Sequence, residues 1–170
     1  MKKLYFKEID SVLGKLRIIC DDGFIIRLLF ENDNLDRSLA QLRDIFGGIK
    51  MCNENTLANA CSKELHAYLN GSLKEFTVKP ALYGTEFDKK VWQGLTQIPY
   101  GQTETYAGLA KLCHVKGARA VGGAVGRNPV PLIVPCHRVI RSDGGLGGFR
   151  GGLENKLALL KIEGIEMKSK

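Results

Sequence analysis

The apolar positions in the first half of the chain fall into strand-like runs followed by helical repeats. Two β-rich runs, Lys15–Cys20 and Phe24–Phe30, are separated by an Asp-Asp-Gly sequence that is typical of a hairpin turn. Two later segments, Leu35–Phe46 and Leu57–Leu69, repeat apolar residues at helical spacing, and each ends at a glycine-containing pair. This pattern predicts a small α/β unit.

The second half is helical and frequently interrupted by glycine and proline. Thr85 has the side chain of a helix N-cap, and the apolar stripe that follows it stops at a Pro-Tyr-Gly sequence. Residues 105–113 and 117–127 form two more short helical patterns joined by a turn, which is typical of a helix-turn-helix motif. The apolar segment Val130–Val134 is predicted to be a strand or an extended segment that reaches the core.

We therefore expect a mixed α/β (α+β) fold with two domains. A small α/β domain is predicted at residues 1–80, and a mostly helical domain with a winged helix-turn-helix-like motif at residues 83–170. A chain of 170 residues is long enough for one or two compact domains with a buried core.

Composition narrows the class of protein. The chain has 44% hydrophobic and 25% charged residues, as ordinary globular proteins do, and its apolar stretches are too short to span a membrane. The N-terminus runs directly into charged residues, without the apolar core of a signal peptide. The five cysteines include no C-x-x-C pair, which disfavours a disulfide framework or a four-cysteine metal site. We expect a cytoplasmic protein with no membrane partner, metal or cofactor.

Positive charge is concentrated in the second half of the chain. Residues 1–80 contain 12 Lys/Arg against 11 Asp/Glu, whereas residues 81–170 contain 13 against 7. A basic domain with few acids is what binding to a phosphate backbone requires. A solvated basic surface would explain the charge equally well, so charge alone indicates nucleic acid without proving it.

The predicted helix at residues 117–127 has an unusual face. At 100° per residue, Arg119, Gly122, Gly123 and Gly126 lie on the same side of the helix. Each glycine costs a helix about 1 kcal/mol relative to alanine, so three together need an explanation. Close helix-helix packing is one explanation. A smooth ridge that lies in the minor groove of DNA, while Arg119 reaches inward, is the explanation we favour.

Cys136 is the cysteine with chemically useful neighbours. His137 and Arg138 follow it directly, and Glu163 stands near the end of a later helical pattern. Adjacent residues on an extended strand point to opposite faces, so either the backbone turns at Cys136 or a water relays its proton to His137. Glu163 is most simply a solvated surface acid, but a carboxylate that orients His137 would complete a nucleophile-base-orienter set. The other four cysteines are interpreted as inert core residues.

The sequence around Cys136 resembles a known active-site signature. Residues Pro135-Cys136-His137-Arg138-Val139 are similar to the signature of the O6-alkylguanine-DNA alkyltransferases, also called methylated-DNA–protein-cysteine methyltransferases. Further family blocks occur in family order: Gly84-Thr85-x-Phe87-x-x-x-Val91-Trp92, Ile98-Pro99-Tyr100-Gly101, Thr105-Tyr106-x-x-Leu109-Ala110, Ala118-Arg119-Ala120-Val121-Gly122, Asn128-Pro129, Gly151-Gly152-Leu153-x-x-Lys156 and Leu159-Leu160-x-x-Glu163-Gly164.

The resemblance is dense over residues 83–165 and weak before them. The first 80 residues match in size, in α/β content and in the helix end Leu65-x-x-Tyr68-Leu69-x-Gly71, and by resemblance form a ribonuclease-H-like domain. The family's zinc-binding cysteines and histidines have no counterparts in this half.

The resemblance implies a protein that repairs DNA and is consumed in doing so. A guanine alkylated at O6, or a thymine methylated at O4, is flipped out of double-stranded DNA, and its alkyl group moves to Cys136 in a single turnover. By the same resemblance His137 deprotonates Cys136 through a water, Glu163 orients His137, and Asn128 braces the turn under the site. The protein is expected to act as a monomer, in the cytoplasm at the nucleoid or in a nucleus.

The resemblance also implies which residues contact DNA and the lesion. Arg119 fills the space left by the flipped base, while Tyr106 presses on the phosphate and donates its hydroxyl proton to the guanine. The other implied DNA-contacting residues are Ala118, Gly122, Gly123, Gly126 and Arg127. The loop 144–152 forms the wall of the substrate pocket, whose implied residues are Trp92, Val139, Gly147, Phe149 and Arg150, although the apolar stripe also makes Trp92 a core anchor.

Two positions depart from the family pattern. Phe149 stands where tyrosine is more common, which removes one hydrogen bond to the base, and Arg150 stands where small polar residues are common, which bears on bulky O6-substituents. Three other functions remain as alternatives: a lesion-binding protein that transfers nothing, a cysteine hydrolase that uses Cys136, His137 and Glu163 repeatedly, and a DNA-binding regulator that needs only the helix-turn-helix part.

Overall fold

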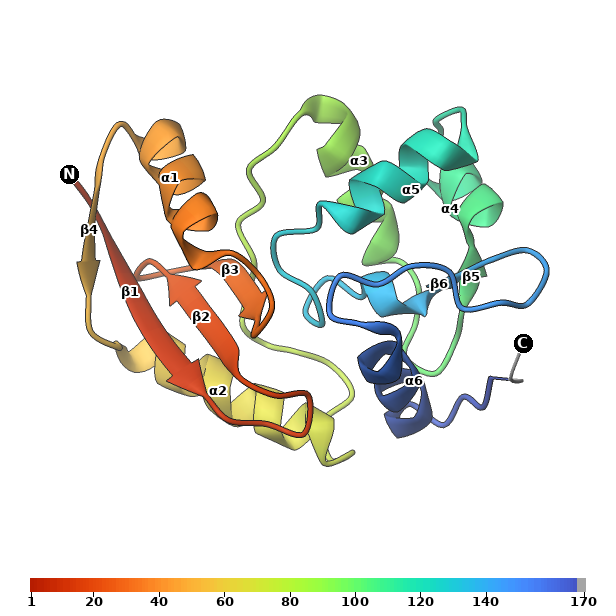
Figure 1. Cartoon of the computed structure of the whole chain (residues 1–170), viewed down its shortest axis with the longest axis horizontal. Coiled ribbons are helices and arrows are strands. Elements are labelled where there is room, and N and C mark those ends of the chain that lie inside the picture. The colour runs from red at the N-terminus through yellow and green to blue at the C-terminus, as the bar shows by residue number, and fades with distance from the viewer. Residues whose placement is uncertain (168–170) are drawn as a thin grey trace. The chain divides into compact units, whose positions relative to one another are not determined.

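The computed structural model describes residues 1–167 of the chain. It divides into two compact units, Met1–Tyr83 and Gly84–Lys170, which are described one at a time (Figure 1). None of the helices in the described part of the chain combines the length and the apolarity that crossing a membrane requires.

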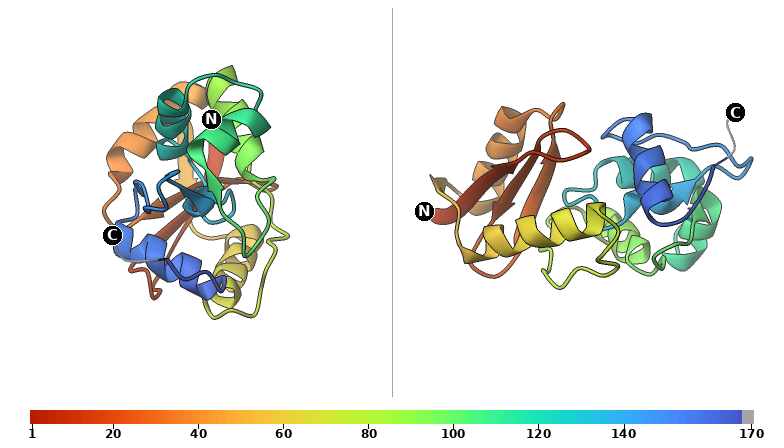
Figure 2. Two further views of the ribbon diagram at one scale, coloured as in Figure 1. Left: turned by 90° about the vertical axis from the view of Figure 1, so that its right-hand side faces the viewer. Right: turned by 90° about the horizontal axis from the view of Figure 1, so that it is seen from below.

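The first unit is a four-stranded sheet with a helix on each face (Figure 2). The strands lie in the order β3-β2-β1-β4; β1 pairs antiparallel with β2, β2 antiparallel with β3, and β1 parallel with β4. The elements of this unit are β1 (Lys2–Ile9), β2 (Leu16–Cys20), β3 (Ile25–Phe30), α1 (Leu35–Phe46), β4 (Ile49–Cys52) and α2 (Thr56–Leu69).

The predicted hairpin and both predicted helices of this unit are confirmed. Every residue of β3 is buried, because α1 and α2 cover the two faces of the sheet, and strands covered on both faces are mostly apolar rather than alternating. Arg27 is the exception in β3 and is buried as well. Asn34 and Asn55 cap the two helices through their side chains. The interior strand β1 and the edge strand β4 were not predicted.

The second unit consists of four helices, a short 3₁₀ helix and two very short strands. Its elements are α3 (Glu86–Leu95), β5 (Glu104–Thr105), α4 (Tyr106–Leu112), α5 (Ala118–Gly126), η1 (Cys136–Arg138), β6 (Val139–Ile140) and α6 (Leu153–Ile162), and β5 pairs in parallel with β6. The mixed α/β fold class is therefore confirmed. Helices α4 and α5 form the predicted helix-turn-helix pair and pack on each other and on α3.

The N-cap prediction at Thr85 is also confirmed, because its hydroxyl accepts a hydrogen bond from the Asp88 backbone N–H at 3.0 Å. Trp92 of α3 is buried, and its indole N–H donates to the carbonyl of Ala124 in α5 at 2.9 Å. This bond joins α3 and α5 inside the unit. It also gives the buried indole the hydrogen-bond partner that such a group requires.

The segment Val130–Val134 does reach the core, since Val130, Leu132 and Val134 are buried, but the prediction that it is extended is wrong, because these residues form a tight turn. The Val134 backbone N–H donates to the carbonyl of Val130 at 2.9 Å, and Leu132 has a left-handed φ of 71°. The buried side chain of Asn128 holds this turn, since its amide donates to the carbonyl of Val134 at 2.8 Å and its oxygen accepts from the Val130 N–H at 3.0 Å. An apolar run alone does not distinguish such a turn from a strand.

Candidate active site

The turn under Cys136 delivers the thiol to the start of a single 3₁₀ turn. The Cys136 N–H donates to the carbonyl of Val134 at 2.8 Å, and the Arg138 N–H donates to the carbonyl of Pro135 at 3.1 Å. The backbone therefore does turn at Cys136, as one of the two possibilities from the sequence required, while the water relay to His137 stays a prediction. Asn128 lies where the family resemblance places a brace for this turn.

Cys136 is 7% exposed, and its environment has opposing effects on its acidity. Burial raises the pKa of the Cys136 thiol, while a hydrogen bond with Asn128 and the positive charges of Arg150 and Lys156 lower it. Burial is the largest of these effects. The group is therefore a thiol in the resting protein, and a base is needed to convert it to the nucleophilic thiolate.

A candidate base lies next to Cys136 in the sequence. His137 is fully buried, and its Nε2 lies 2.6 Å from a carboxylate oxygen of Glu163, which ends α6. Burial lowers the pKa of His137, although Glu163 opposes this shift, so the ring is neutral at pH 7 and able to accept a proton. The interpretation of Glu163 as a solvated surface acid is wrong, because its side chain is fully buried and bonded to His137.

Glu163 also binds two groups that the sequence did not reveal as its partners. Arg138 donates from Nε to one Glu163 oxygen at 2.9 Å and from Nη2 to the other at 3.1 Å, and the backbone N–H of Gly101 donates at 3.0 Å. Arg138 donates further to the carbonyl of Ile98 at 2.7 Å. The carboxylate is thus fixed by several donors, and the carboxylate in turn fixes the ring of His137.

A second residue of α6, Lys156, holds the loop that follows β6. Its ammonium is buried and donates to the carbonyls of Val139 at 2.7 Å, Gly148 at 3.1 Å and Leu146. Burial lowers the pKa of Lys156 to about 8, so it is mainly protonated at pH 7. Sequence reasoning gave this lysine no role. The available signal was its place among the apolar positions of α6, where a solvated lysine is not expected.

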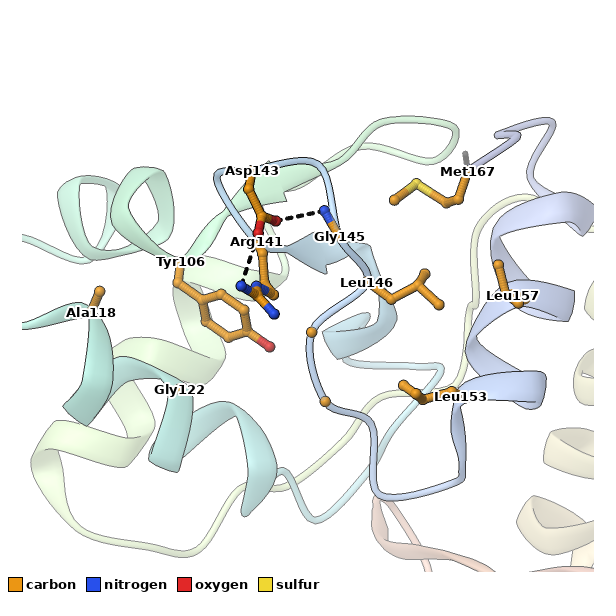
Figure 3. Close-up of a pocket in the computed structure, with 12 residues that line it drawn as sticks. Tyr106, Ala118, Gly122, Arg141, Asp143, Gly145, Leu146, Leu153, Leu157 and Met167 are labelled. Carbon is orange, nitrogen blue, oxygen red and sulfur yellow. Dashed lines mark hydrogen bonds and ion pairs between the residues drawn. The ribbon is translucent and has the colours of Figure 1, made fainter. Parts of the chain in front are cut away.

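Tyr106, the first residue of α4, lines a cavity of about 860 Å³ (Figure 3). On one side lie Tyr106, Ala118 and Gly122; on the other lie Leu146, Leu153, Leu157 and Met167. Burial and the neighbouring Cys136 raise the pKa of Tyr106, so its hydroxyl keeps its proton at neutral pH. Cys136 itself is not among the cavity-lining residues of the described part of the chain.

The loop 144–152 approaches Tyr106 closely. Gly147 has a φ of 72°, and a Cβ atom there would lie 2.9 Å from the Tyr106 hydroxyl oxygen. Both its backbone conformation and this short distance therefore require glycine. Gly147 lines the cavity, as do Gly145, Leu146 and Gly148, so this loop forms a wall of the cavity, and its contact with the substrate stays a prediction.

The other four residues assigned to the substrate pocket do not line this cavity, and for three of them the contacts give the physical reason. Trp92 is bonded to Ala124 in the core, and Val139 is fully buried in β6. Arg150 is drawn to the end of α5, where its Nη1 donates to backbone carbonyls. Phe149 belongs to the same loop, but its side chain is not among the lining residues either.

The glycine face of α5 is open. Gly123 and Gly126 are exposed, and within residues 1–167 a Cβ atom on Gly126 would meet no atom within 4 Å. Gly122 lies beside the Tyr106 ring, where a Cβ would be 3.7 Å away. Close helix-helix packing therefore does not explain these glycines, and the exposed Arg119 projects from the same accessible helix.

Ala118 and Arg127 lie at the two ends of α5. Ala118 is exposed and lines the cavity. The guanidinium of Arg127 is held by Asp88 of α3, with an Nη2–Oδ1 distance of 2.7 Å and an Nε–Oδ2 distance of 3.2 Å. Arg127 therefore forms a bidentate ion pair that fixes the end of α5, and its DNA-contacting role stays a prediction. No group of three or more His, Cys, Asp or Glu side chains in the described residues is placed to hold a metal ion.

Comparison with known proteins assigns the family. Residues 4–82 match the ribonuclease-like domain of 6-O-methylguanine DNA methyltransferase, and residues 86–165 match its DNA-binding domain. The methylated-DNA–protein-cysteine methyltransferase of Methanosarcina mazei is 51% identical over 97% of this chain and 100% of that protein, and that of Mycobacterium leprae is 49% identical over 94% and 92%.

Solved structures show the same likeness. The O6-methylguanine methyltransferase of Mycobacterium tuberculosis has a TM-score of 0.81 and 35% identity, covering 94% of this chain and 92% of that chain. Mycobacterium tuberculosis OGT in complex with DNA matches with the same values. The chain belongs to the methylated-DNA–protein-cysteine methyltransferase family.

Proposed function

We propose that this protein repairs DNA directly by moving the alkyl group of O6-alkylguanine to the sulfur of Cys136, once per molecule. The observation that carries the proposal is the buried set Cys136, His137 and Glu163 in the unit that also carries the glycine-faced helix α5. A nucleophile with its own base lies in the same unit as a DNA-binding motif. The family assignment supports the same reaction.

In the proposed mechanism, Nε2 of His137 donates to Glu163, so Nδ1 is the ring nitrogen that takes a proton. A water accepts the thiol proton of Cys136 and passes a proton to this nitrogen. The Cys136 thiolate then attacks the alkyl carbon, a sulfur–carbon bond forms, and the carbon–O6 bond breaks with its electron pair staying on the guanine. Tyr106 donates its hydroxyl proton to the base as this charge develops.

The substrate reaches the cysteine by base flipping, which costs a few kcal/mol of unstacking. We infer that α5 lies against double-stranded DNA, because its open glycine face permits close approach of the backbone and Arg119 is exposed beside it. Arg119 occupies the space that the base leaves. Tyr106 supports the rotated nucleotide at the cavity, next to the loop that carries Gly147.

The same geometry favours a monomer that reacts once. All the proposed catalytic groups come from the second unit, so no partner subunit is needed to complete the site. The product is a thioether, which has no activated leaving group, and the sulfur is not regenerated. The cysteines of the described residues are all free thiols, which suits a reducing compartment such as the cytoplasm.

The test is to mix the protein with duplex DNA that carries O6-methylguanine and to analyse the peptides by mass spectrometry. We expect one methyl group on the Cys136 peptide and an equal amount of unmodified guanine in the DNA. The Cys136→Ala variant should bind the DNA and leave the lesion intact. An unmodified Cys136 together with a persisting lesion would refute the proposal. Turnover of more than one lesion or ester per protein would favour a hydrolase instead.

A further inference from the structure

Arg150 lies in the loop 144–152 but does not line the cavity. Its Nη1 donates two hydrogen bonds, to the carbonyl of Asn128 at 2.8 Å and to the carbonyl of Gly126 at 3.2 Å. Gly126 is the last residue of α5, and Asn128 follows two residues later. The side chain therefore connects the pocket loop to the C-terminal end of the helix proposed to lie on DNA.

The chemistry of a helix end explains why an arginine binds there. The last carbonyls of a helix have no partner within the helix, and together they present partial negative charge. At α5 the Arg127 N–H donates back to Gly123 and Ala124, and Arg150 supplies a charged donor for the carbonyls beyond them. Hydrogen bonds with a charged donor are stronger than neutral ones. The contact is thus a charged cap delivered from a distant segment.

The same loop is held on its other side by Lys156. That ammonium binds the carbonyls of Leu146 and Gly148, together with Val139 of β6. The loop is therefore held at two places: Lys156 binds it to β6 and α6, and Arg150 binds it to α5. Of these two contacts, only that of Arg150 connects the loop to the helix that carries Arg119.

Asn128 connects the Arg150 contact to the turn that carries the nucleophile Cys136. Its carbonyl receives Arg150, while its side chain holds the turn before Cys136 through Val134 and Val130. A displacement of the end of α5 would therefore be felt both by the pocket wall and by the turn under the cysteine. This continuity is a physical path rather than a sequence correlation.

We propose that Arg150 is a positioning residue that fixes the pocket loop to the end of α5, so that docking of α5 on DNA and ordering of the pocket wall occur together. The proposal rests on the proposed function, because it assumes that α5 contacts DNA. It also gives Arg150 a role other than shaping the pocket for the alkyl substituent.

The first measurement is hydrogen exchange with and without unmodified duplex DNA, which requires no alkyl transfer. In the wild-type protein DNA should slow exchange both in α5 and in the loop 144–152. In Arg150→Met, DNA should still protect α5 but no longer the loop, and Arg150→Gln, which lacks the charge and the length, should behave alike. Arg150→Lys should restore part of the loop protection. The control is Lys161→Met, which removes one exposed positive charge from the same unit and should match wild type.

The second measurement compares methyl transfer from duplex DNA with alkyl transfer from free O6-benzylguanine, which does not engage α5. Arg150→Met should slow the duplex reaction by about tenfold, as expected for the loss of charge-assisted bonds. It should slow the free-base reaction by clearly less, because that reaction loses only the positive charge that lowers the pKa of Cys136. Equal losses in both reactions, or full DNA protection of the loop in both neutral variants, would overturn the proposal. A wild-type protein that transfers no methyl group would instead refute the proposed function and leave the exchange test in force.

Discussion

Replacing Glu163 by glutamine removes one buried negative charge and keeps nearly the same shape. The carboxylate accepts hydrogen bonds from Arg138 and from the Gly101 backbone N–H and is bonded to His137. A carboxamide has one oxygen and one NH₂ group, so it can satisfy only some of these donors. Arg138, which is also buried, would lose its counter-charge.

The magnitude follows from that unpaired charge. Removing one partner of a buried ion pair costs about 3–5 kcal/mol, a large part of the ~5–15 kcal/mol that stabilises a typical protein. For a chain of this size about 1 kcal/mol shifts the melting temperature by roughly 2–4 °C. The Glu163→Gln protein should therefore melt roughly 6–20 °C lower than wild type and should still be folded in the cold.

Activity should fall by a separate cause. If the carboxamide turns its NH₂ group toward Nε2 of His137, the ring must carry its proton on Nδ1, where the mechanism needs a lone pair. Loss of a correctly placed general base costs about 10²–10⁴-fold in rate. We therefore expect alkylation of Cys136 by free O6-benzylguanine to slow by about 10² or more in Glu163→Gln.

The assay is a quenched time course of alkylated Cys136 peptide, run at a temperature at which circular dichroism shows the variant to be folded. Glu154→Gln is the matched control: it makes the same change at the exposed N-terminal end of α6 and should cost only a few tenths of a kcal/mol. A folded Glu163→Gln protein that reacts at the wild-type rate would refute the orienting role and leave Glu163 a purely structural partner of Arg138.

Two further predictions concern other residues of the second unit. Because the folded pKa of Lys156 is about 8 and its ordinary value is 10.5, the unfolded chain binds more protons at this lysine between these pH values, so Lys156 should contribute a rise of about 3 kcal/mol in the free energy of unfolding from pH 8 to pH 10.5. The buried cysteines, whose folded pKa values are raised, act in the opposite direction, so the rise is measured by urea unfolding as the difference between wild type and Lys156→Met, and parallel curves for the two proteins would contradict it. Arg119→Ala should slow repair of duplex DNA by tenfold or more while leaving transfer from free O6-benzylguanine unchanged, since the free base leaves no space to fill; equal losses in the two rates would count against the intrusion role.

The elements that the sequence predicted well are those coded by local signals. The cap residues Asn34, Asn55 and Thr85 mark the starts of α1, α2 and α3, and the apolar residues within each helix repeat at helical spacing. Of the two missed strands in the first unit, β1 forms a hairpin with β2, with Ile9 paired to Leu16, whereas β4 depends on a distant partner. β4 has four residues and pairs in parallel with β1, across a connection that includes α1, so little in its own sequence indicates a strand.

The active site was predicted only in part, because some of its contacts join residues that are distant in the sequence. Cys136 and His137 are adjacent, and the family motif supplied Glu163, which the structure brings to His137 across 26 residues. Arg138 and Lys156 belong to the family motifs, but the sequence indicates no role for them. Charged residues are normally solvated, and only the fold shows that these two are buried. The hydrogen-bond partners of these two residues follow from the fold and not from their residue types.

The distribution of buried charge points to the chemistry of this unit. Burying ionised groups is rarely favourable for stability, yet Glu163, Arg138 and Lys156 are all buried near Cys136. Each is accounted for by positioning: Glu163 and Arg138 fix the neutral base, and Lys156 fixes the loop beside Tyr106. They surround His137, the proposed base that activates the thiol, but none of them could make the carbon of a thioether reactive toward water. The unfavourable burial of these charges therefore positions the groups for a single transfer, after which the alkylated protein cannot react again.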